Sequence, residues 1–462
     1  MTGFGDTIAA VSTPRGKGGV AVIRISGAEA IAFCDQVFRA ANGTPLSQTA
    51  SNFAVWGRIL EDGEVLDDGI ATVFRAPRSF TGEDTVEISC HGGILVTEAV
   101  LSTILAAGAR AAEAGEFTRR AFVNGKLGLS HAEALASLLE AGNRNQLMLS
   151  RSGLEGKIAE RCRVIYGALC DILGSVYSKI DYPDEDLSGL SRETLVASLE
   201  QSCADVEALL ATYKSGHAVA EGVRTVICGR PNAGKSSLYN RMVGREAAIV
   251  TDIAGTTRDI LEETVPFGGV TLRLCDTAGL RGGEDIDAVE KIGVERARAR
   301  LEEAELILAL FDGTQIPDKE DEALISSLSE RGDSVIAVVS KSDLGGDAMR
   351  ARLIEAFGHV IEVSSVADTG LDALACEVER RFLDGGVDLR HDAVVASARQ
   401  YASLCRCRDA LNAARSSLAA GFPEELCAAD IETAMQAVGE LDSRAVSDDI
   451  VSNIFSRFCV GK

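Results

Sequence analysis

The chain contains 462 residues, with 46% hydrophobic and 25% charged residues, 12 cysteines and a formal net charge of −23. This length predicts two or three domains, and the composition excludes collagen-like, coiled-coil and disordered chains. The negative charge disfavours a protein that holds nucleic acid through its own overall electrostatic field. The sequence has no run of eighteen apolar residues and no CxxC pair, so we expect a cytoplasmic protein with reduced cysteines and no membrane segment. Its five histidines form no ligand cluster, so we expect no transition metal.

Two regions with different sequence patterns make up the first half of the chain. From Thr7 to about Lys126, β-rich runs such as 20–25 and 85–89 alternate with glycine turns and helical stretches, which predicts an α+β domain. From about 127 to 217, Ala, Leu, Glu and Arg recur at helical spacing, so this region is expected to be helical.

The next region, from about 221 to 382, alternates short apolar strands with amphipathic helices. The expected strands are 224–228, 270–275, 306–311, 335–339 and 360–363. This alternation predicts a mostly parallel sheet with helices on both faces. After about residue 392 the composition is helical again, so the simplest architecture inserts the α/β domain into a helical domain. The expected boundaries are 1–125 for the N-terminal domain, 126–217 and 385–462 for the two helical parts, and 218–384 for the insertion.

A phosphate-binding motif opens the inserted domain. Residues 229–236 read Gly-Arg-Pro-Asn-Ala-Gly-Lys-Ser and match GxxxxGK[ST] between an apolar strand and a helical run. Backbone amides of such a loop bind phosphates, Lys235 would contact the β- and γ-phosphates, and Ser236 would bind Mg²⁺. A glycine-rich turn without a ligand is the alternative interpretation.

Two further motifs have the composition of nucleotide switches. Residues 251–259 form a polar, glycine-containing segment whose Thr257 would complete the Mg²⁺ shell only in the presence of the γ-phosphate. Asp276-Thr-Ala-Gly279 ends an apolar strand, where the carboxylate would hold Mg²⁺ through water and the Gly279 amide would contact the γ-phosphate.

The choice of base is predicted from Lys341-Ser342-Asp343, which follows an apolar strand at the carboxyl edge of the expected sheet. The Asp343 carboxylate would accept two hydrogen bonds from guanine, and adenine lacks that donor pair. Ser340 stands where GTPases generally have Asn, and Ser364 begins a degenerate form of the last guanine-loop element. The complete set of expected GTP contacts is Asn232, Ala233, Gly234, Lys235, Ser236, Ser237, Thr251, Asp252, Ile253, Ala254, Gly255, Thr256, Thr257, Asp276, Thr277, Ala278, Gly279, Lys341, Asp343 and Ser364.

These motifs, in order on matching elements, predict a Ras-like, doubly wound P-loop GTPase domain within a multi-domain α/β and α+β protein. Together with outer segments, they resemble the tRNA modification GTPase MnmE (TrmE) family over essentially the full length. The resemblance is carried by 229–236, 251–259 and Asp-Thr-Ala-Gly-Leu-Arg from 276, and outside the GTPase domain by 18–27, 80–84, 91–93, 115–117, 121–126 and the terminal Phe-Cys-Val-Gly-Lys.

The resemblance implies an N-terminal domain that binds 5-formyl- or methylene-tetrahydrofolate and forms a homodimer. It also implies a FAD-dependent partner of the MnmG (GidA) type, a heterotetramer as the complex, and tRNA modified at carbon 5 of the wobble uridine. The family's folate contacts would fall on Arg24, Glu87, Lys126 and Lys462, which suits a ligand whose tail carries carboxylates. An exposed strand residue and a surface carboxylate are the alternatives for Arg24 and Glu87. Cys459 is a candidate catalytic thiolate or a structural thiol.

The hydrolytic groups are also implied by the resemblance. Leu280 follows the Asp276–Gly279 motif where many small GTPases carry a water-positioning Gln. In the family, potassium offsets the developing charge, and its ligands would be Asn232, Thr251, Ile253 and Thr256. The catalytic carboxylate maps onto Glu290, with Glu284 as the second choice because the intervening stretch is longer than usual.

Three functions remain open from the sequence. The leading prediction is an enzyme in which GTP hydrolysis drives domain rearrangement during one-carbon transfer to tRNA. The alternatives are a regulatory switch or assembly factor without one-carbon chemistry, and an N-terminal domain that only dimerises. Because the chain is acidic, we expect the partner to supply most of the basic surface that tRNA requires.

Overall fold

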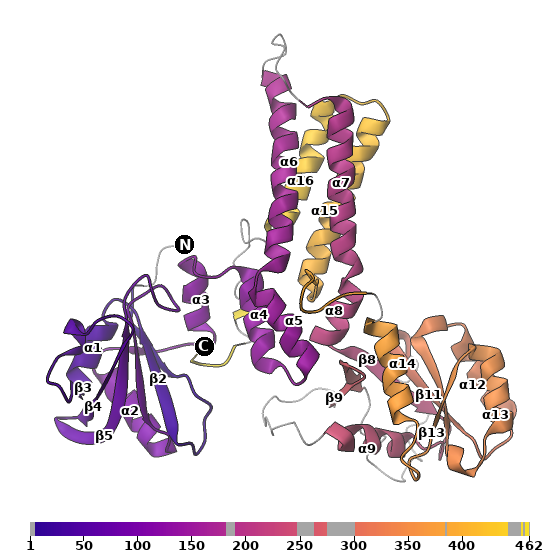
Figure 1. Ribbon diagram of the computed structural model, residues 1–462, viewed down its shortest axis with the longest axis horizontal. Helices are drawn as coiled ribbons and strands as arrows, with labels where there is room; N and C mark the ends of the chain where they lie inside the picture. The colour runs from indigo at the N-terminus through magenta and orange to yellow at the C-terminus, as the bar shows by residue number, and fades with distance from the viewer. Residues whose placement is uncertain are drawn as a thin grey trace, which may run out of the picture. The chain divides into compact units, whose positions relative to one another are not determined.

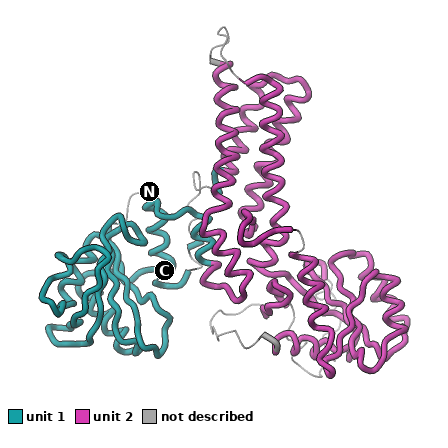
Figure 2. The backbone as a smooth tube through the Cα atoms, in the orientation of Figure 1, with its two compact units in different colours: residues 1–136, 439–462 teal, residues 137–438 magenta. Residues whose placement is uncertain are grey.

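A computed structural model of the chain describes residues 5–181, 190–246, 263–274, 301–383, 386–441, 454–455 and 458–461. The chain divides into two compact units, one of residues 1–136 with 439–462 and the other of residues 137–438, coloured separately in Figure 2. No helix in these described ranges is both long and apolar enough to cross a membrane.

The first unit is built on a seven-stranded sheet. Its strands are β1 (Ile8–Val11), β2 (Val20–Ser26), β3 (Phe38–Ala40), β4 (Phe53–Glu61), β5 (Glu64–Phe74), β6 (Thr85–His91) and β7 (Arg110–Ala111). They lie in the order β3-β4-β5-β6-β2-β1-β7, and β7 alone of these pairs in parallel, with β1. The two strands expected at 20–25 and 85–89 are therefore confirmed as β2 and β6.

The two faces of this sheet differ in what covers them. Side chains alternate along a strand, and Ala21, Ile23 and Ile25 of β2 lie in the main core, against helices α1 (Ala30–Val37) and α2 (Ile94–Ala106) (Figure 1). The residues between them, including Arg24, point to the opposite face. Helix α3 (Glu116–Val123) covers the β1 end of that face, where Phe117 packs with Ile8.

The C-terminal residues belong to this first unit. Phe455 and Phe458 pack with Leu129 at the start of helix α4 (Leu129–Glu140), and Val460 forms a β-bridge with Ala114. Ser130 Oγ donates a 3.0 Å hydrogen bond to the Leu441 carbonyl. The end of the chain thus returns to its N-terminal part, as expected for a domain inserted between them.

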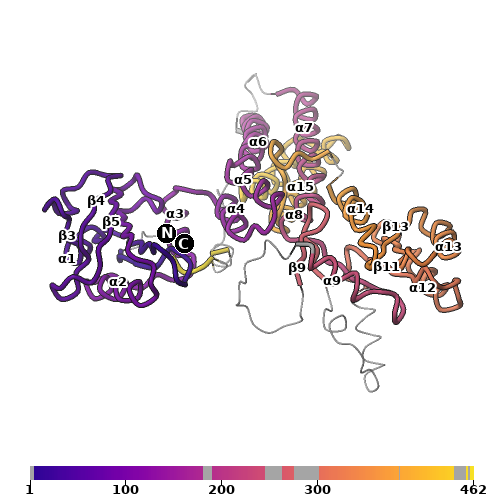
Figure 3. Tube along the Cα trace, turned by 60° about the horizontal axis from the view of Figure 1, so that its bottom comes forward, coloured from indigo at the N-terminus to yellow at the C-terminus, as the bar shows by residue number. Residues whose placement is uncertain are grey.

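The second unit begins with a helical part. It contains α5 (Arg144–Leu154), α6 (Lys157–Asp181), α7 (Arg192–Ala211), α8 (Tyr213–Ala220), α15 (Ala398–Ala419) and α16 (Ala428–Gly439), and Figures 1 and 3 show the long helices side by side. The Ser191 side chain caps α7, and Ser397 with Gln400 forms a capping box at the start of α15. Helix α6 ends at Asp181, and residues 182–189 lie outside the described residues.

The rest of the second unit is the predicted α/β domain. Its strands β8 (Val223–Gly229), β9 (Glu263–Phe267), β10 (Val270–Leu274), β11 (Leu306–Asp312), β12 (Val335–Ser340) and β13 (Val360–Val363) lie in the order β13-β12-β11-β8-β10-β9. Its helices are α9 (Lys235–Glu246), α12 (Lys319–Ser329), α13 (Asp347–Phe357) and α14 (Leu371–Leu383). All neighbouring strands are parallel except β9, which pairs antiparallel with β10.

Both faces of this sheet are buried, as a doubly wound domain requires. In β11, Leu308 packs with α9 and α14 residues on one side, whereas Ile307 packs with α12 and α13 residues on the other. The five strands expected from the sequence are confirmed. Strand β9 was missed because Pro266 interrupts its pattern, and an edge strand tolerates proline since one side of it needs no ladder hydrogen bonds.

Candidate functional sites

The phosphate-binding loop joins β8 to α9 and depends on three residues with positive φ. Gly229 has φ 148°, and a Cβ there would lie 2.3 Å from the Leu310 carbonyl oxygen. Asn232 and Gly234 have φ 63° and 92°. Glycine adopts such angles without strain and asparagine does so more readily than bulky residues. These three residues therefore allow a tight loop whose amides turn towards the start of a helix. Ser236 and Ser237 are exposed in the first turn of that helix.

Lys235 lies across this loop. Its Nζ donates hydrogen bonds of 2.9 Å to the Gly229 carbonyl and 2.7 Å to the Arg230 carbonyl. Burial lowers the pKa of the Lys235 ammonium because desolvation disfavours the charged form. The ammonium is thus held where it can exchange carbonyl oxygens for phosphate oxygens, which are better partners for a desolvated charge.

Arg230 braces the loop and was not singled out from the sequence. Its guanidinium forms ion pairs with Asp318, Glu320 and Asp321 at 2.6, 2.8 and 3.2 Å, at the capped start of α12. These partners follow Arg230 by 88 to 91 positions, so no local pattern connects them. The contacts fix the loop against the next helix of the domain.

The predicted base-recognition residues meet at the carboxyl ends of β12 and β13. Lys341 has φ 55°, and its Nζ pairs with Asp312 Oδ2 at 2.6 Å. Ser364 Oγ donates a 2.6 Å hydrogen bond to Asp343 Oδ1 and accepts one of 3.0 Å from the Ala367 amide. Asp343 itself is exposed, so its second oxygen remains accessible to a base.

Ser340, the departure from the usual Asn, is bonded within the sheet. Its Oγ donates a 3.1 Å hydrogen bond to the Phe311 carbonyl, and the side chain is buried. A Cβ on Gly234 would lie 3.6 Å from Ser340 Cβ, so the phosphate loop and the base loop approach each other here. The short serine side chain fits this space.

Several predicted site residues lie outside the described part of the chain. They comprise the Mg²⁺ ligand Thr257, the K⁺ ligands Thr251, Ile253 and Thr256, the other switch residues Asp252, Ala254 and Gly255, Asp276, Thr277, Ala278 and Gly279, the carboxylates Glu284 and Glu290, and Lys462. Their roles remain predictions.

A second candidate site lies on the open face of the sheet in the first unit. Arg24 on β2 and Glu87 on β6 face each other across the ladder, with the Arg24 Nε and Nη2 atoms each 2.8 Å from Glu87 Oε1. The Arg24 guanidinium also lies 5.6 Å from the ring centre of Phe80 and 5.7 Å from that of Phe117. The two charged side chains are about one-quarter exposed, at 22% and 28%. The partly buried Arg24–Glu87 pair offers hydrogen-bond donors and an acceptor beside an exposed aromatic ring, which suits binding of a flat, polar heterocycle.

Lys126 lies against the loop that carries Phe80. Its Nζ donates a 2.8 Å hydrogen bond to the Pro77 carbonyl, and a Cβ on Gly82 would lie 3.2 Å from Lys126 Cγ. Asn124 Nδ2 donates to the Thr81 carbonyl at 2.8 Å and holds the same loop. Lys126 is therefore near Phe80 in the fold, although almost fifty positions separate them.

A buried arginine supports this second site and was also missed. The Arg120 side chain is fully buried and pairs with Asp6 at 2.7 Å, Glu116 at 3.0 Å and Glu83 at 3.3 Å. Glu83 in turn accepts a 2.8 Å hydrogen bond from Ser26 at the end of β2. The network fixes α3 and the 81–85 loop against the sheet beside Arg24.

The C-terminal tail packs beside β1. Ser12 Oγ donates a 3.0 Å hydrogen bond to the Gly461 carbonyl, and the Gly115 amide donates to the Cys459 carbonyl at 3.4 Å. Gly461 has φ 99°, and a Cβ there would lie 2.1 Å from the Val11 carbonyl oxygen. The glycine of the terminal motif is thus required for docking, while the Cys459 side chain is exposed.

Comparisons with known proteins match the chain over its whole length. The family described as GTP-binding protein TrmE N-terminus matches residues 7–126, and the MnmE helical domain family matches residues 129–459. Proteins named tRNA modification GTPase MnmE are 42% identical in Listeria innocua, 41% in Listeria welshimeri and 40% in Shouchella clausii, each over 99% of both chains. A solved structure of Era in complex with MgGDPNP and nucleotides of 16S ribosomal RNA matches 41% of this chain and 66% of that chain, at 25% identity with a TM-score of 0.27.

Proposed function

This chain belongs to the tRNA modification GTPase MnmE family, and on that premise we propose that it hydrolyses GTP to drive modification of the wobble uridine of tRNA at carbon 5. The observation that carries the GTPase part is the convergence of Lys235, Ser340 and the Asp343–Ser364 pair at the carboxyl edge of one parallel sheet. Nucleotides bind at this edge in open α/β sheets.

Different described residues bind different parts of GTP. The loop from Gly229 to Ser236 binds the phosphates through its amides, Lys235 neutralises them, and Asp343 selects guanine. Mg²⁺ held by Ser236 and Thr257, with K⁺ held near Asn232, would supply positive charge for the phosphoryl oxygens. Glu290 is the proposed base that orients the attacking water.

We propose the Arg24–Glu87 site as the place where a reduced folate binds. Glu87 accepts hydrogen bonds from the amine and amide edge of the heterocycle, Phe80 contacts its flat face, and Lys126 with Lys462 pairs with carboxylates of the tail. The bound folate supplies the one-carbon unit. The charged pair and the adjacent aromatic rings support this assignment.

The proposed assembly is a homodimer through the first unit, joined by a FAD-dependent partner of the MnmG type into a heterotetramer that acts on tRNA. Support for the dimer comes from Trp56 and Ile70, which pair across β4 and β5 on the open sheet face and are 55% and 44% exposed. Exposed apolar side chains of this size commonly mark protein contacts.

Binding of tetrahydrofolate to the full chain separates this proposal from a switch without one-carbon chemistry. Arg24→Ala and Glu87→Gln are each expected to weaken folate binding about tenfold or more, and to leave GTP affinity unchanged. Arg58→Ala is the matched control, because Arg58 forms a loose, exposed ion pair with Asp68 on the same sheet. Equal folate binding by all variants would reject the site. The complete function is tested by measuring the wobble uridine of tRNA in a strain that lacks this chain. The uridine is expected to be unmodified, and its modification is expected to be restored by the native chain and not by the Arg24→Ala variant.

A further inference from the structure

The β9–β10 hairpin occupies a special position in the chain. Strand β9 begins shortly after the 251–259 switch motif, and β10 ends just before Asp276 of the next nucleotide motif. Its two strands are paired over their full lengths, from Glu263 with Leu274 to Phe267 with Val270. The hairpin is therefore the described element that lies between the two nucleotide motifs along the chain.

The turn of this hairpin is seated tightly within the second unit. Gly268 has φ 57°, and a Cβ there would lie 2.4 Å from the Ala375 carbonyl oxygen of α14. Gly269 has φ 74°, and a Cβ there would lie 2.9 Å from Asn145 Nδ2 and 3.0 Å from Leu383 Cδ1. The turn accordingly lies between the last helix of the GTPase domain and helix α5 of the helical part.

Three side-chain amides from the start of α5 bind the hairpin. Asn145 Nδ2 donates to the Gly269 carbonyl at 2.8 Å, and Asn143 Nδ2 and Gln146 Nε2 donate to Thr271 Oγ1 at 3.2 and 3.1 Å. Asn143 Oδ1 also accepts a 2.9 Å hydrogen bond from the Gln146 amide, which caps α5. The contact with the hairpin is thus joined directly to the start of the helix.

These contacts are sensitive to small movements. Hydrogen bonds between neutral groups weaken steeply as the distance grows and the angle worsens, whereas the exposed ion pairs elsewhere on the surface are less directional. A shift of the hairpin by about an ångström would therefore break the hydrogen bonds from Asn143 and Gln146 to Thr271.

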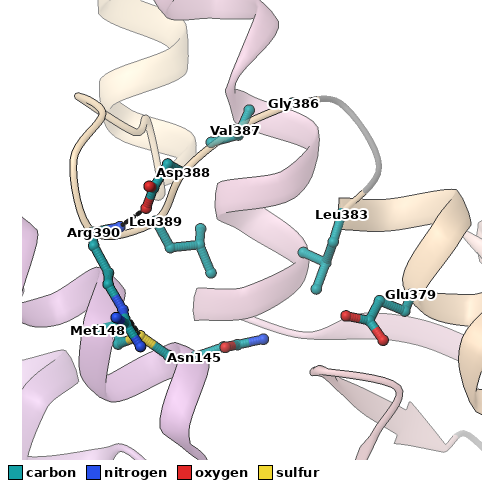
Figure 4. A pocket seen from close by; sticks show the side chains of 9 residues that line it. All are labelled: Asn145, Met148, Glu379, Leu383, Gly386, Val387, Asp388, Leu389 and Arg390. Carbon is teal, nitrogen blue, oxygen red and sulfur yellow. Dashed lines mark hydrogen bonds between the residues drawn. The ribbon is translucent and has the colours of Figure 1, made fainter.

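A cavity of about 440 Å³ lies beside this contact (Figure 4). It is lined by Asn145 and Met148 of α5, Glu379 and Leu383 of α14, and the segment from Gly386 to Arg390 that leads back to the helical part. Figure 4 shows the Arg390 side chain reaching Met148, and its Nε lies 2.8 Å from the Met148 sulfur. The cavity borders α5 at Asn145 and Met148, so this side of the helix is not packed against a dense core.

We propose that Asn143, Asn145 and Gln146 are positioning residues that sense the position of the β9–β10 hairpin and transmit the nucleotide state of the GTPase domain to helix α5. This inference rests on the proposed function and names the contact through which hydrolysis acts on the helical part. The amides bind Gly269 and Thr271 at the start of β10, the opposite end of that strand from the carboxyl edge that carries the phosphate loop. Their removal is therefore expected to change the coupling between the two parts rather than the chemistry of hydrolysis.

Hydrogen–deuterium exchange of residues 144–154 in the full chain measures this coupling. In the native chain, the exchange rate of these amides is expected to differ at least fivefold between the states bound to GDP and to a non-hydrolysable GTP analogue. In Asn145→Ala combined with Thr271→Val, which preserves the shape of Thr271 and removes its hydroxyl, the difference is expected to disappear. GTP affinity and hydrolysis are expected to stay within about twofold of the native values.

Two controls accompany this variant. Thr271→Ser keeps the accepting hydroxyl and is expected to retain the native difference. Gln201→Ala removes an exposed amide on α7 that bonds Asp205 of its own helix, and is expected to change nothing.

Equal α5 exchange in the two nucleotide states of the native chain, or a difference that persists in the double variant, would overturn the proposal. A parallel loss of GDP and GTP-analogue binding would show that the amides only support the GTPase fold. The exchange measurement does not depend on tRNA. A native chain that shows the nucleotide-dependent difference but leaves tRNA unmodified would therefore contradict the proposed function and retain the coupling.

Discussion

Ser364 Oγ donates a 2.6 Å hydrogen bond to Oδ1 of Asp343, and this bond joins the segments that follow two neighbouring strands, β12 and β13, at the candidate base-recognition site. The bond orients one carboxylate oxygen and leaves the other exposed. Because hydrogen bonds to a charged group contribute about 1.5–3 kcal/mol, the orientation of Asp343 is well determined.

Asp343→Asn is expected to shift preference from GTP towards xanthosine triphosphate, since the asparagine amide donates to the extra xanthine oxygen and opposes a guanine donor. Ser364→Ala is expected to weaken GTP binding about tenfold without changing base preference. Competition binding with the two triphosphates measures both effects. Ser365→Ala serves as the control, because the contact of Ser365 with Arg241 uses its backbone carbonyl and does not need the side chain. Unchanged GTP affinity in Asp343→Asn would refute the base assignment.

Docking of the C-terminal tail is expected to be required for tRNA modification and dispensable for GTP hydrolysis. Gly461→Ala introduces a Cβ that would lie 2.1 Å from the Val11 carbonyl oxygen, so the tail cannot keep its position. This variant and deletion of residues 459–462 should both lose modification while hydrolysing GTP at near-native rates. Gly63→Ala has a similar positive φ with open space around it, and controls for backbone strain alone. A truncated chain that no longer binds GTP would identify the tail as a folding element instead.

Removal of the buried Arg120 guanidinium is expected to destabilise the first unit by about 3–5 kcal/mol, because Glu83, Glu116 and Asp6 lose their shared partner. Urea unfolding of Arg120→Ala, followed by the fluorescence of the single tryptophan, Trp56, reports on this unit. Arg58→Ala removes an exposed arginine from the same sheet and should change the free energy of unfolding little. If Arg120→Ala changes the free energy of unfolding only slightly, the carboxylates of Glu83, Glu116 and Asp6 must become hydrated in the variant at little cost.

Glu377 is expected to make the second unit sensitive to acid. Hydrogen bonds from Arg380, together with those from Arg381, lower the pKa of this buried carboxyl from 4.5 to about 2. Since the folded-state pKa is the lower one, the ionised carboxylate stabilises the fold above pH 4.5, and this contribution is lost as the pH falls from 4.5 to 2. The shift sets an upper bound of about 3 kcal/mol on the effect.

Glu377→Gln should therefore lower the urea midpoint, followed by circular dichroism, at pH 7 and have a much smaller effect near pH 2.5. Glu355→Gln, which removes a carboxylate that is 77% exposed and paired with Arg352, should have little effect at either pH. A loss of stability in Glu377→Gln that is the same at both pH values would point to packing rather than charge.

Local sequence was sufficient to locate five of the six described strands of the GTPase domain, all but β9, and to place the phosphate loop and the loop that carries Asp343 at strand ends. Lys235 and Asp343 lie in short patterns whose spacing is set by one turn, so neighbouring residues alone identify them. Ion pairs between residues that are far apart in the sequence could not be predicted in this way. Arg230 meets Asp318, and Arg120 meets Asp6, only because strands and helices far apart in the chain are adjacent in the fold. The pairing of Ser364 with Asp343 likewise depends on the register between β12 and β13.

Leu280 follows the Asp276–Gly279 motif, where many small GTPases carry a water-positioning Gln. A leucine can neither donate nor accept a hydrogen bond, so another group must orient water, and a cation must offset the charge that develops between the β- and γ-phosphates. Asn232 is exposed in the phosphate loop with φ 63°, an angle that asparagine adopts more readily than most residues, and its amide oxygen is a suitable ligand for a monovalent ion.

GTP turnover is therefore expected to be much faster in potassium than in sodium, and Asn232→Ala should remove most of this difference while GTP binding persists. Glu290→Ala is expected to lower turnover by roughly 10² or more without weakening GTP binding. Steady-state rates in the two salts, with GTP affinity measured separately, test both statements. Equal rates in the two salts would contradict the potassium site. If Glu290→Ala is active and Glu284→Ala loses turnover while it still binds GTP, the catalytic carboxylate is Glu284 instead.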